Sequence, residues 1–386
     1  MSGSYRLSTA KVLAPNDNSK NQVYFGPGFG ALNVIPSGAI APDPKGRPTF
    51  RAALDFAWLD SQGGLEPAPG AQLILYPEYP EVRFSGFLRR TVSAPSTLMT
   101  SRTPGRVLFL GITGERRVIG VAVSADTRIA REFRNLPSPA SVGVFVEIPI
   151  SQRRIERNPR EVLLRQLTRI NAKGWIDSKR LRSDGTVTNC TAPQCGGYTL
   201  EAELGIRPNS LSEPDFMGWE IKQHGVPALD RLTVGVITLM TPEPTGGYYK
   251  ASGPEAFVRR FGYADVSGRP DRFNFGGIHV ADRRHPRTGL ILRLRGVDAK
   301  SLKILDVTGG LSLESDRGVV AAHWRYSALM EHWNRKHALA AYVPSICRQE
   351  PTRQYQYGNG VRLGEGVIFQ NHSASRSGVF QKLSPT

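Results

Sequence analysis

Three residues near the middle of the chain have the types and the spacing to form a catalytic site. They occur in the pattern Pro-Asp-x4-Glu-x-Lys, as Asp215, Glu220 and Lys222. Residues 219–222 have the alternation of a β-strand, so Glu220 and Lys222 lie on one face and Ile221 turns toward the core. Because Asp215 enters from the preceding turn, two carboxylates and one ammonium group converge on a small volume.

This group of side chains is suited to a hard cation that prefers oxygen ligands, such as Mg²⁺. Asp215, Glu220 and the backbone carbonyl of Ile221 are the expected ligands. Such an ion stabilises charge on a phosphodiester and lowers the pKa of a bound water, which Lys222 would orient. The pattern therefore predicts metal-assisted hydrolysis of phosphodiester bonds, although the short pattern alone also occurs on solvated surface strands.

The segment upstream makes this prediction more specific. Residues 198–204 read as a short helix that ends at Gly205, and the helix carries a third carboxylate, Glu201. The whole arrangement resembles the MvaI/BcnI family of restriction endonucleases, in which a Gly-Tyr-Thr-Leu-Glu helix precedes a Pro-Asp…Glu-x-Lys strand. The resemblance covers roughly residues 155–386. It implies a PD-(D/E)XK mixed sheet flanked by helices, and it implies that the catalytic residues are Glu201, Asp215, Glu220 and Lys222.

The balance of charges indicates a polyanionic partner. The chain has 50 Lys and Arg residues against 33 Asp and Glu, a formal net charge of +17. The excess of basic residues is larger in the part of the chain that carries the catalytic pattern. Such a field attracts a polyanion and makes binding dependent on salt. Charge alone does not separate nucleic acid from an anionic membrane, but the nuclease pattern favours double-stranded DNA.

Length and composition predict folded domains without a membrane span. A chain of 386 residues is long enough for two domains, and no apolar run reaches the ~18 residues of a spanning helix. The first residues lack the apolar core of a signal peptide, so we expect a cytoplasmic protein. The three cysteines are Cys190, Cys195 and Cys347. We expect no disulfide, and we interpret Cys190 and Cys195 as loop cysteines rather than zinc ligands.

The fold class expected from these patterns is mixed α+β, in two domains. Residues 1–150 show short apolar runs bounded by turn residues, typical of a small barrel or sandwich. A polar, arginine-rich linker is expected at 151–157, and the nuclease domain at 158–386.

A second resemblance lies close to the N-terminus. An Asn-Asp dipeptide with a downstream Asn-Gln is similar to the N-terminal effector-binding domain of EcoRII-type enzymes, a B3-like β-pseudobarrel that binds a second copy of the target DNA. An Asn/Asp/Ser-rich turn is the alternative interpretation. The resemblance implies a monomeric enzyme of type IIE and a second set of DNA-binding residues, Asn16, Asp17, Asn21 and Gln22.

A basic loop and a half-basic strand are the candidates for sequence readout. Leucines at 290, 292 and 294 alternate with Ile291 and two arginines, so one face of this strand is apolar and the other is basic. Arginine reads guanine in the major groove, but arginine also holds phosphate, and the two roles stay open for each residue. The predicted contacts are Arg283, Arg284, Arg287, Arg293 and Arg295.

Several other elements are predicted from periodicity and end signals. We expect short helices at 125–133, 158–170 and 252–261, a buried strand at 232–240 and a long helix at 319–339.

The function expected from these observations is that of a type II restriction endonuclease. The family resemblance implies Mg²⁺-dependent cleavage of duplex DNA at a short pseudo-palindromic site such as CCWGG or CCSGG. One alternative is a mismatch-repair-like nickase or a modification-dependent endonuclease. Another is a DNA-binding protein with an inactive nuclease fold, but such a protein has no physical need to keep four clustered charged residues.

Overall fold

The structure, a computed structural model, describes ten segments of the chain. They are residues 7–13, 22–136, 141–148, 159–207, 214–229, 240–269, 271–301, 303–334, 339–358 and 362–365. The chain forms two compact units. One includes Met1–Ile150 and Pro242–Glu331, and the other includes Ser151–Thr241 and His332–Gly366.

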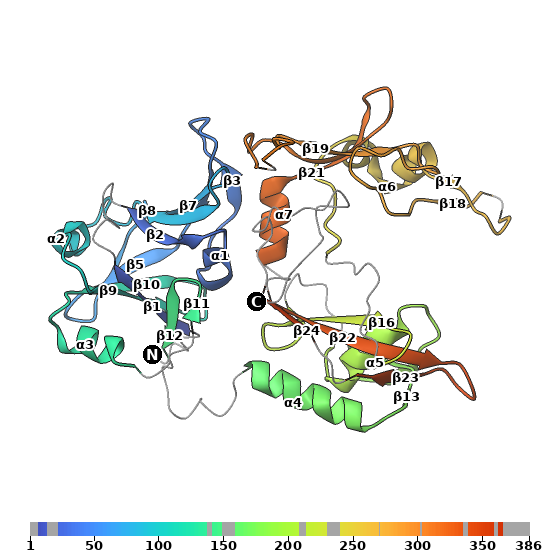
Figure 1. Ribbon diagram of the computed structural model, residues 1–386, viewed down its shortest axis with the longest axis horizontal. Coiled ribbons are helices and arrows are strands. Elements are labelled where there is room, and N and C mark those ends of the chain that lie inside the picture. The colour runs from blue at the N-terminus through green and yellow to red at the C-terminus, as the bar shows by residue number, and fades with distance from the viewer. Residues whose placement is uncertain are drawn as a thin grey trace. The chain divides into compact units, whose positions relative to one another are not determined.

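Residues up to 148 form two β-sheets, as the short apolar runs predicted (Figure 1). The first sheet has the order β11 (Ser141–Val142), β12 (Phe145–Ile148), β1 (Leu7–Leu13), β9 (Arg106–Ile112), β10 (Val118–Val123), β5 (Phe56–Leu59) and β6 (Leu65–Pro67). The second has the order β2 (Gln22–Pro27), β8 (Glu81–Ser85), β7 (Gln72–Tyr76), β4 (Phe50–Ala53) and β3 (Ile40–Pro42). The helices of this region are α1 (Ala31–Val34), α2 (Ser96–Thr100) and α3 (Arg128–Arg134).

An aromatic cluster fills the core of this β-rich region. Phe84 of β8 lies 5.2 Å from Phe25 and 5.0 Å from Phe56 between ring centroids, and it stacks on Phe87 at 4.6 Å. All four rings are buried. These aromatic residues therefore stabilise the region by packing.

The catalytic pattern lies in a second region with its own sheet. The strands have the order β13 (Ile176–Asp177), β23 (Gln354–Tyr357), β22 (Leu339–Arg348) and β16 (Glu220–Gly225), and β24 (Arg362–Glu365) also pairs with β22. Strands β16 and β22 are parallel, whereas the other pairs are antiparallel. The remaining elements are α4 (Pro159–Ala172), the hairpin β14 (Lys179–Leu181) and β15 (Val187–Asn189), and α5 (Cys195–Glu203).

The predicted helices and strand of this region are confirmed and share one core. Helix α4 presents Leu163, Leu167 and Ile170 to a cluster that includes Trp219 and Ile221 of the catalytic segment. Helix α5 ends just before Gly205, which has a positive φ of 72°. The predicted strand at 232–240 lies outside the described residues, apart from its last position.

Residues 242–331 form a smaller sheet with one helix packed on it. The elements are α6 (Tyr248–Phe261), β17 (Tyr263–Ala264), β18 (Phe273–Asn274), β19 (Ile291–Arg295), β20 (Gly310–Glu314), β21 (Val320–Arg325) and α7 (Tyr326–His332). Strands β19, β20 and β21 are antiparallel neighbours, and α6 lies beside them (Figure 1). Two leucines of the apolar face predicted at 290–294, Leu290 and Leu292, pack with Leu313 in the same cluster as Phe257 and Phe261 of α6.

The long helix predicted at 319–339 is wrong. The segment instead contains strand β21, the short helix α7 and the beginning of β22 at Leu339. Ala321 and Ala322 favour a helix by local propensity, but both are fully buried in the core of the small sheet. Pairing with β20 outweighs the local preference.

The expectation of unpaired loop cysteines is also wrong. Cys190 and Cys195 form a disulfide, with their Cα atoms 5.7 Å apart. Both cysteines are buried in the core of the catalytic region. The short connection from β15 to α5 brings them within the range of a disulfide. Cys347 is free and exposed.

None of the helices in the described segments is long and apolar enough to cross a membrane.

Gly247, at the N-terminus of α6, should be essential for the packing of this helix on the small sheet. Its φ is 80°, and an added Cβ would lie 3.0 Å from the backbone of Ala322. We expect Gly247→Ala to destabilise this region by about 2–3 kcal/mol through backbone strain and overlap. Hydrogen–deuterium exchange of α6 and β21 measures the change. Ser252→Ala, at an exposed position of α6, is the matched control, and equal exchange in both variants would contradict the prediction.

Candidate active site

A two-residue turn brings the two acidic residues of the pattern onto one face. Phe216 and Trp219 exchange both backbone hydrogen bonds, each 2.8 Å from N to O. The two residues between them have positive φ angles, 48° and 91°, as in a type I′ turn. Asp215 and Glu220 are the next pair outward, so their side chains project to the same side. The spacing of the acidic residues is therefore the spacing of a tight β-hairpin.

Glu220 is almost completely buried, with 2% of the residue exposed. Lys222 Nζ lies 2.7 Å from Glu220 Oε1, and the backbone N–H of Ile221 donates a hydrogen bond of 2.9 Å to Asp215 Oδ2. Burial raises the pKa of Glu220 to about 7; the Lys222 ammonium group opposes this rise and the adjacent Asp215 carboxylate adds to it. Without a cation, Glu220 therefore keeps a proton into the neutral range.

These residues fit a hard divalent cation. Two carboxylates that touch inside a protein favour either a shared proton or a cation between them. In the described part of the chain, no group of three or more His, Cys, Asp or Glu side chains could form an all-side-chain metal site. Mg²⁺ needs only one or two carboxylates and keeps several waters. Asp215, Glu220 and the carbonyl of Ile221 would therefore hold such an ion with water completing its shell.

Helix α5 packs closely against the catalytic strand. Tyr357 donates a hydrogen bond of 2.7 Å from its hydroxyl to the carbonyl of Gly196. A Cβ at Gly196 would lie 2.7 Å from Oε1 of Gln223 on β16, so a larger residue would displace the end of this side chain, which donates a hydrogen bond to Ser345. The structure thus places Glu201 on a helix that packs beside the strand of Glu220.

A second carboxylate of α5, Glu203, is occupied by two lysines. Lys173 Nζ lies 2.6 Å from its Oε2, and Lys179 pairs with its other oxygen. Although burial opposes ionisation, the two lysines hold the pKa of Glu203 below its usual value. Glu203 therefore stabilises the attachment of α5, which leaves Glu201 as the carboxylate of this helix to be tested for a catalytic role.

Two residues beside the site were not predicted from the sequence. His224 follows Lys222 by two positions on β16, so alternation places both side chains on the face of Glu220. Tyr342 of β22 stands opposite Lys222 in the parallel register. Burial, with an addition from the Glu220 charge, raises the pKa of Tyr342 to about 12. One more step of the strand alternation would have found His224, whereas Tyr342 depends on pairing between distant segments.

The five predicted arginines lie on β19 and on the loop that runs along its edge. The loop joins the edge through isolated bridges, and one of them pairs Arg284 with Ile291. Paired residues share a face, so Arg284 lies on the face of Arg293 and Arg295. Arg283 and Arg287 belong to the same loop, and the guanidinium of Arg287 lies 5.1 Å from the ring centroid of Tyr263.

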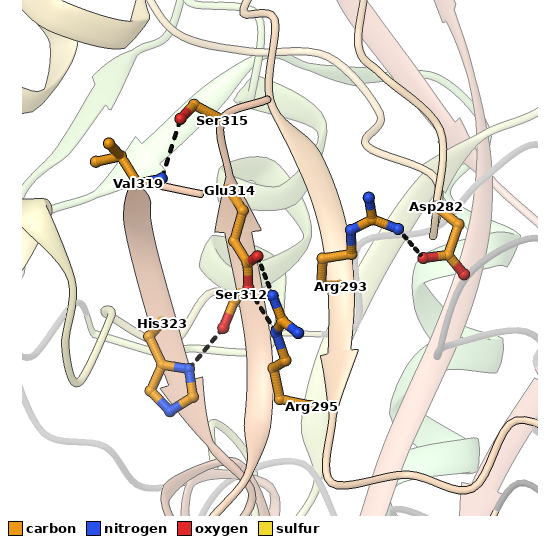
Figure 2. Close-up of polar contacts among 8 residues, drawn as sticks. All are labelled: Asp282, Arg293, Arg295, Ser312, Glu314, Ser315, Val319 and His323. Carbon is orange, nitrogen blue, oxygen red and sulfur yellow. Dashed lines mark hydrogen bonds and ion pairs between the residues drawn. The ribbon is translucent and has the colours of Figure 1, made fainter. Parts of the chain in front are cut away.

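Three of these arginines form ion pairs with acidic residues. Arg284 pairs with Asp316 at 2.8 Å and Arg293 with Asp282 at 2.7 Å. Figure 2 shows the second of these pairs beside that of Arg295 with Glu314. No acidic partner was predicted from the sequence, because each pair joins two different strands or loops.

The DNA-binding residues predicted near the N-terminus lie only partly within the described residues. Asn16, Asp17 and Asn21 lie outside them, and Gln22 is the first residue of β2. Its Oε1 accepts a hydrogen bond of 3.3 Å from Nη1 of Arg83. This contact places Gln22 beside a basic side chain of strand β8.

Comparison with known proteins identifies a family for the second half of the chain. Residues 164–375 match the MvaI/BcnI restriction endonuclease family, a range that includes α5, β16 and β22. No curated protein matches the chain.

Two solved structures of the restriction endonuclease MvaI are similar to parts of this chain. The complex of MvaI with its cognate DNA substrate has 18% sequence identity and a TM-score of 0.40, over 54% of this chain and 75% of that chain. MvaI in the absence of DNA has 17% identity and a TM-score of 0.26, over 55% and 77%. The family assignment therefore depends on the sequence match.

The burial of Glu220 predicts an unusual pH dependence of stability. A carboxyl group with a raised pKa stabilises the folded state below its unfolded pKa of ~4.5, and this contribution is lost as the pH rises through ~7. We therefore expect the metal-free protein to lose about 1–3 kcal/mol between pH 5 and pH 8, relative to Glu220→Gln. Urea denaturation in EDTA at both values measures the difference.

Glu255→Gln, on the surface of α6, is the matched control and should track the unchanged protein at both pH values. A stability difference between Glu220→Gln and the unchanged protein that is the same at pH 5 and pH 8 would contradict the interpretation of Glu220 as a buried, protonated carboxyl group.

Proposed function

Because the chain belongs to the MvaI/BcnI restriction endonuclease family, we propose that it is a type II enzyme that cleaves both strands of a short DNA site with Mg²⁺. The observation that carries this proposal is the hairpin that holds Asp215 and Glu220 on one face with Lys222. The expected target is pseudo-palindromic with an odd central base pair, such as CCWGG or CCSGG. The protein would act as a monomer and cut the strands in turn.

Each residue of the site has a defined task in this proposal. Asp215 and Glu220 hold the cation, and Glu220 gives up its proton when the cation binds. Bound Mg²⁺ would stabilise negative charge on the phosphate and lower the pKa of a bound water. Lys222, which is one-quarter exposed, reaches from the buried carboxylate toward solvent and orients the attacking water. Glu201 supports the ligands from α5.

Substitutions in the site should separate chemistry from binding. We expect Lys222→Ala and Asp215→Ala to lower the cleavage rate by at least ~100-fold, because they remove the water-orienting ammonium group and a cation ligand. Specific DNA binding in Ca²⁺ should be largely retained, because positioning uses other residues. Glu201→Ala should be milder. The measurement is cleavage of a sequenced plasmid with Mg²⁺, followed by mapping of the ends.

The matched control is Glu203→Ala, which removes a carboxylate of the same helix from a structural ion pair. It should lower stability and leave the cut position unchanged. Cleavage by Lys222→Ala at close to the rate of the unchanged protein would mean that the active site lies elsewhere.

The β-rich region at residues 1–150 is proposed to be a B3-like module that binds a second copy of the target, as in type IIE enzymes. Support comes from the two-sheet architecture, the net positive charge and the Asn-Asp…Asn-Gln pattern that ends at Gln22. Its expected contacts are Asn16, Asp17, Asn21 and Gln22. Occupancy of this module would raise cleavage at the catalytic region.

A duplex that carries the site should therefore change cleavage of a one-site plasmid. We expect the rate to rise about 5- to 100-fold, the range of typical coupling energies. The double variant Asn21→Ala, Gln22→Ala should lose this response but still cut slowly at the same position. Gln62→Ala, an exposed glutamine of the same region, is the control and should respond fully. An equal response from the double variant would contradict the effector role.

A further inference from the structure

The small sheet presents one polar face and one apolar face. In its register, Arg295 of β19 stands opposite Gly310 of β20, which in turn stands opposite Arg325 of β21. The neighbouring row contains Arg293, Ser312 and His323 in the same order. The opposite face packs on α6. On the polar face, Arg295 and Arg325 are exposed and Arg293 is half-exposed, whereas Gly310 and Ser312 are buried. The arginines of these rows are therefore available for contacts outside the core.

Arg295 and Glu314 form the most constrained ion pair of this face (Figure 2). Arg295 Nε donates to Glu314 Oε1 at 2.8 Å, and Arg295 Nη2 donates to the other carboxylate oxygen. The Glu314 side chain is 6% exposed, whereas the Arg295 side chain is 58% exposed. The buried carboxylate therefore fixes the orientation of a guanidinium group that faces solvent.

A guanidinium group has two forked edges, and Glu314 uses only one of them. The bidentate pair occupies the Nε/Nη2 edge, which leaves the Nη1/Nη2 edge on the exposed side. Two parallel N–H donors in a fixed plane match O6 and N7 of guanine in the major groove.

The charge of the pair argues against a role in phosphate binding. Phosphate contacts depend on net positive charge and release of counterions, and Glu314 neutralises Arg295. The other two pairs are looser, because each has a single hydrogen bond to a carboxylate that is more than half exposed, Asp282 or Asp316. Those arginines can turn to phosphate, whereas Arg295 cannot leave Glu314 without leaving the buried carboxylate unpaired.

We propose that Arg295 reads a guanine through its Nη1/Nη2 edge, and that Glu314 is the positioning residue that holds this edge in place. The assignment depends on the proposed function, because it requires that the chain recognise a site in duplex DNA. The sequence left open whether this arginine contacts a base or a phosphate, and the proposal assigns it to a base.

The test uses the full-length protein and short duplexes that carry the mapped site, with binding measured in Ca²⁺. Each guanine is replaced singly by 7-deazaguanine, which lacks the N7 acceptor. We expect one replacement to weaken binding about 2- to 10-fold, because it removes one of the two hydrogen bonds of a bidentate base contact. Arg295→Ala should bind the natural and the modified duplex equally. Arg295→Lys should not restore the difference, because an ammonium group lacks the fork.

Glu314→Gln tests the positioning role. In this variant the same 7-deazaguanine should cause a smaller loss of binding affinity, because the guanidinium group is less firmly held. The affinity of the variant for unrelated duplexes should stay the same or increase. Arg259→Ala is the control, because it removes one arginine from the surface of α6 in the same region. With this variant, 7-deazaguanine should weaken binding as much as it does with the unsubstituted protein. The salt dependence of binding should be the same for Arg295→Ala as for the unchanged protein.

The opposite pattern would overturn the assignment. If Arg295→Ala weakened all duplexes alike and lowered the salt slope by about one, Arg295 would be a phosphate contact. Full retention of the 7-deazaguanine effect in Arg295→Ala would place guanine readout on another residue. If the protein without substitutions cut DNA at no preferred site, no site could be mapped. That outcome would overturn the proposed function itself, and it differs from every outcome that concerns only Arg295.

Discussion

The contact between Asp215 and Glu220 inside the protein is the constraint on which the site depends. Glu220 is buried and Asp215 is half-buried, and two carboxylates in contact repel each other when both are charged unless a positive group joins them. Lys222 supplies part of this charge from the same strand, and a divalent cation would supply the rest. Binding of such a cation would therefore offset the repulsion between the two carboxylates. A nuclease with this arrangement would be less stable without the cation than with it.

The surrounding structure keeps these carboxylates from separating. Trp219 and Ile221, on the opposite face of the hairpin and strand, pack in the same core as α4, α5 and β22. Tyr357 holds the first turn of α5 through the carbonyl of Gly196. Movement of the backbone that carries the carboxylates would require the hairpin to leave this core, at the cost of exposing large apolar side chains. The hydrophobic core thus maintains a repulsive arrangement of charges.

Features that depend on neighbouring residues could be predicted from the sequence, and features that depend on distant pairing could not. The convergence of Asp215 with Glu220 and the two faces of β19 were both expected from local spacing, and the structure has both arrangements, although the hairpin that joins the two carboxylates was not predicted. Tyr342 reaches the site only through the parallel pairing of β16 with β22. Glu314 meets Arg295 across strands. The long helix expected at 319–339 failed for the same reason, because pairing with β20 outweighs local propensity.

The parallel pairing of β16 with β22 also imposes a delay during synthesis, because β16 is made well before its partner strand. More than 100 residues separate the two strands, and residues 242–331 between them have a small hydrophobic core of their own. At typical rates of about 5–20 residues per second, β22 leaves the ribosome roughly 5–25 s after β16. Throughout that interval the strand that carries Glu220 and Lys222 lacks its parallel neighbour. A nascent chain therefore contains the catalytic residues before it contains the strand that pairs with them.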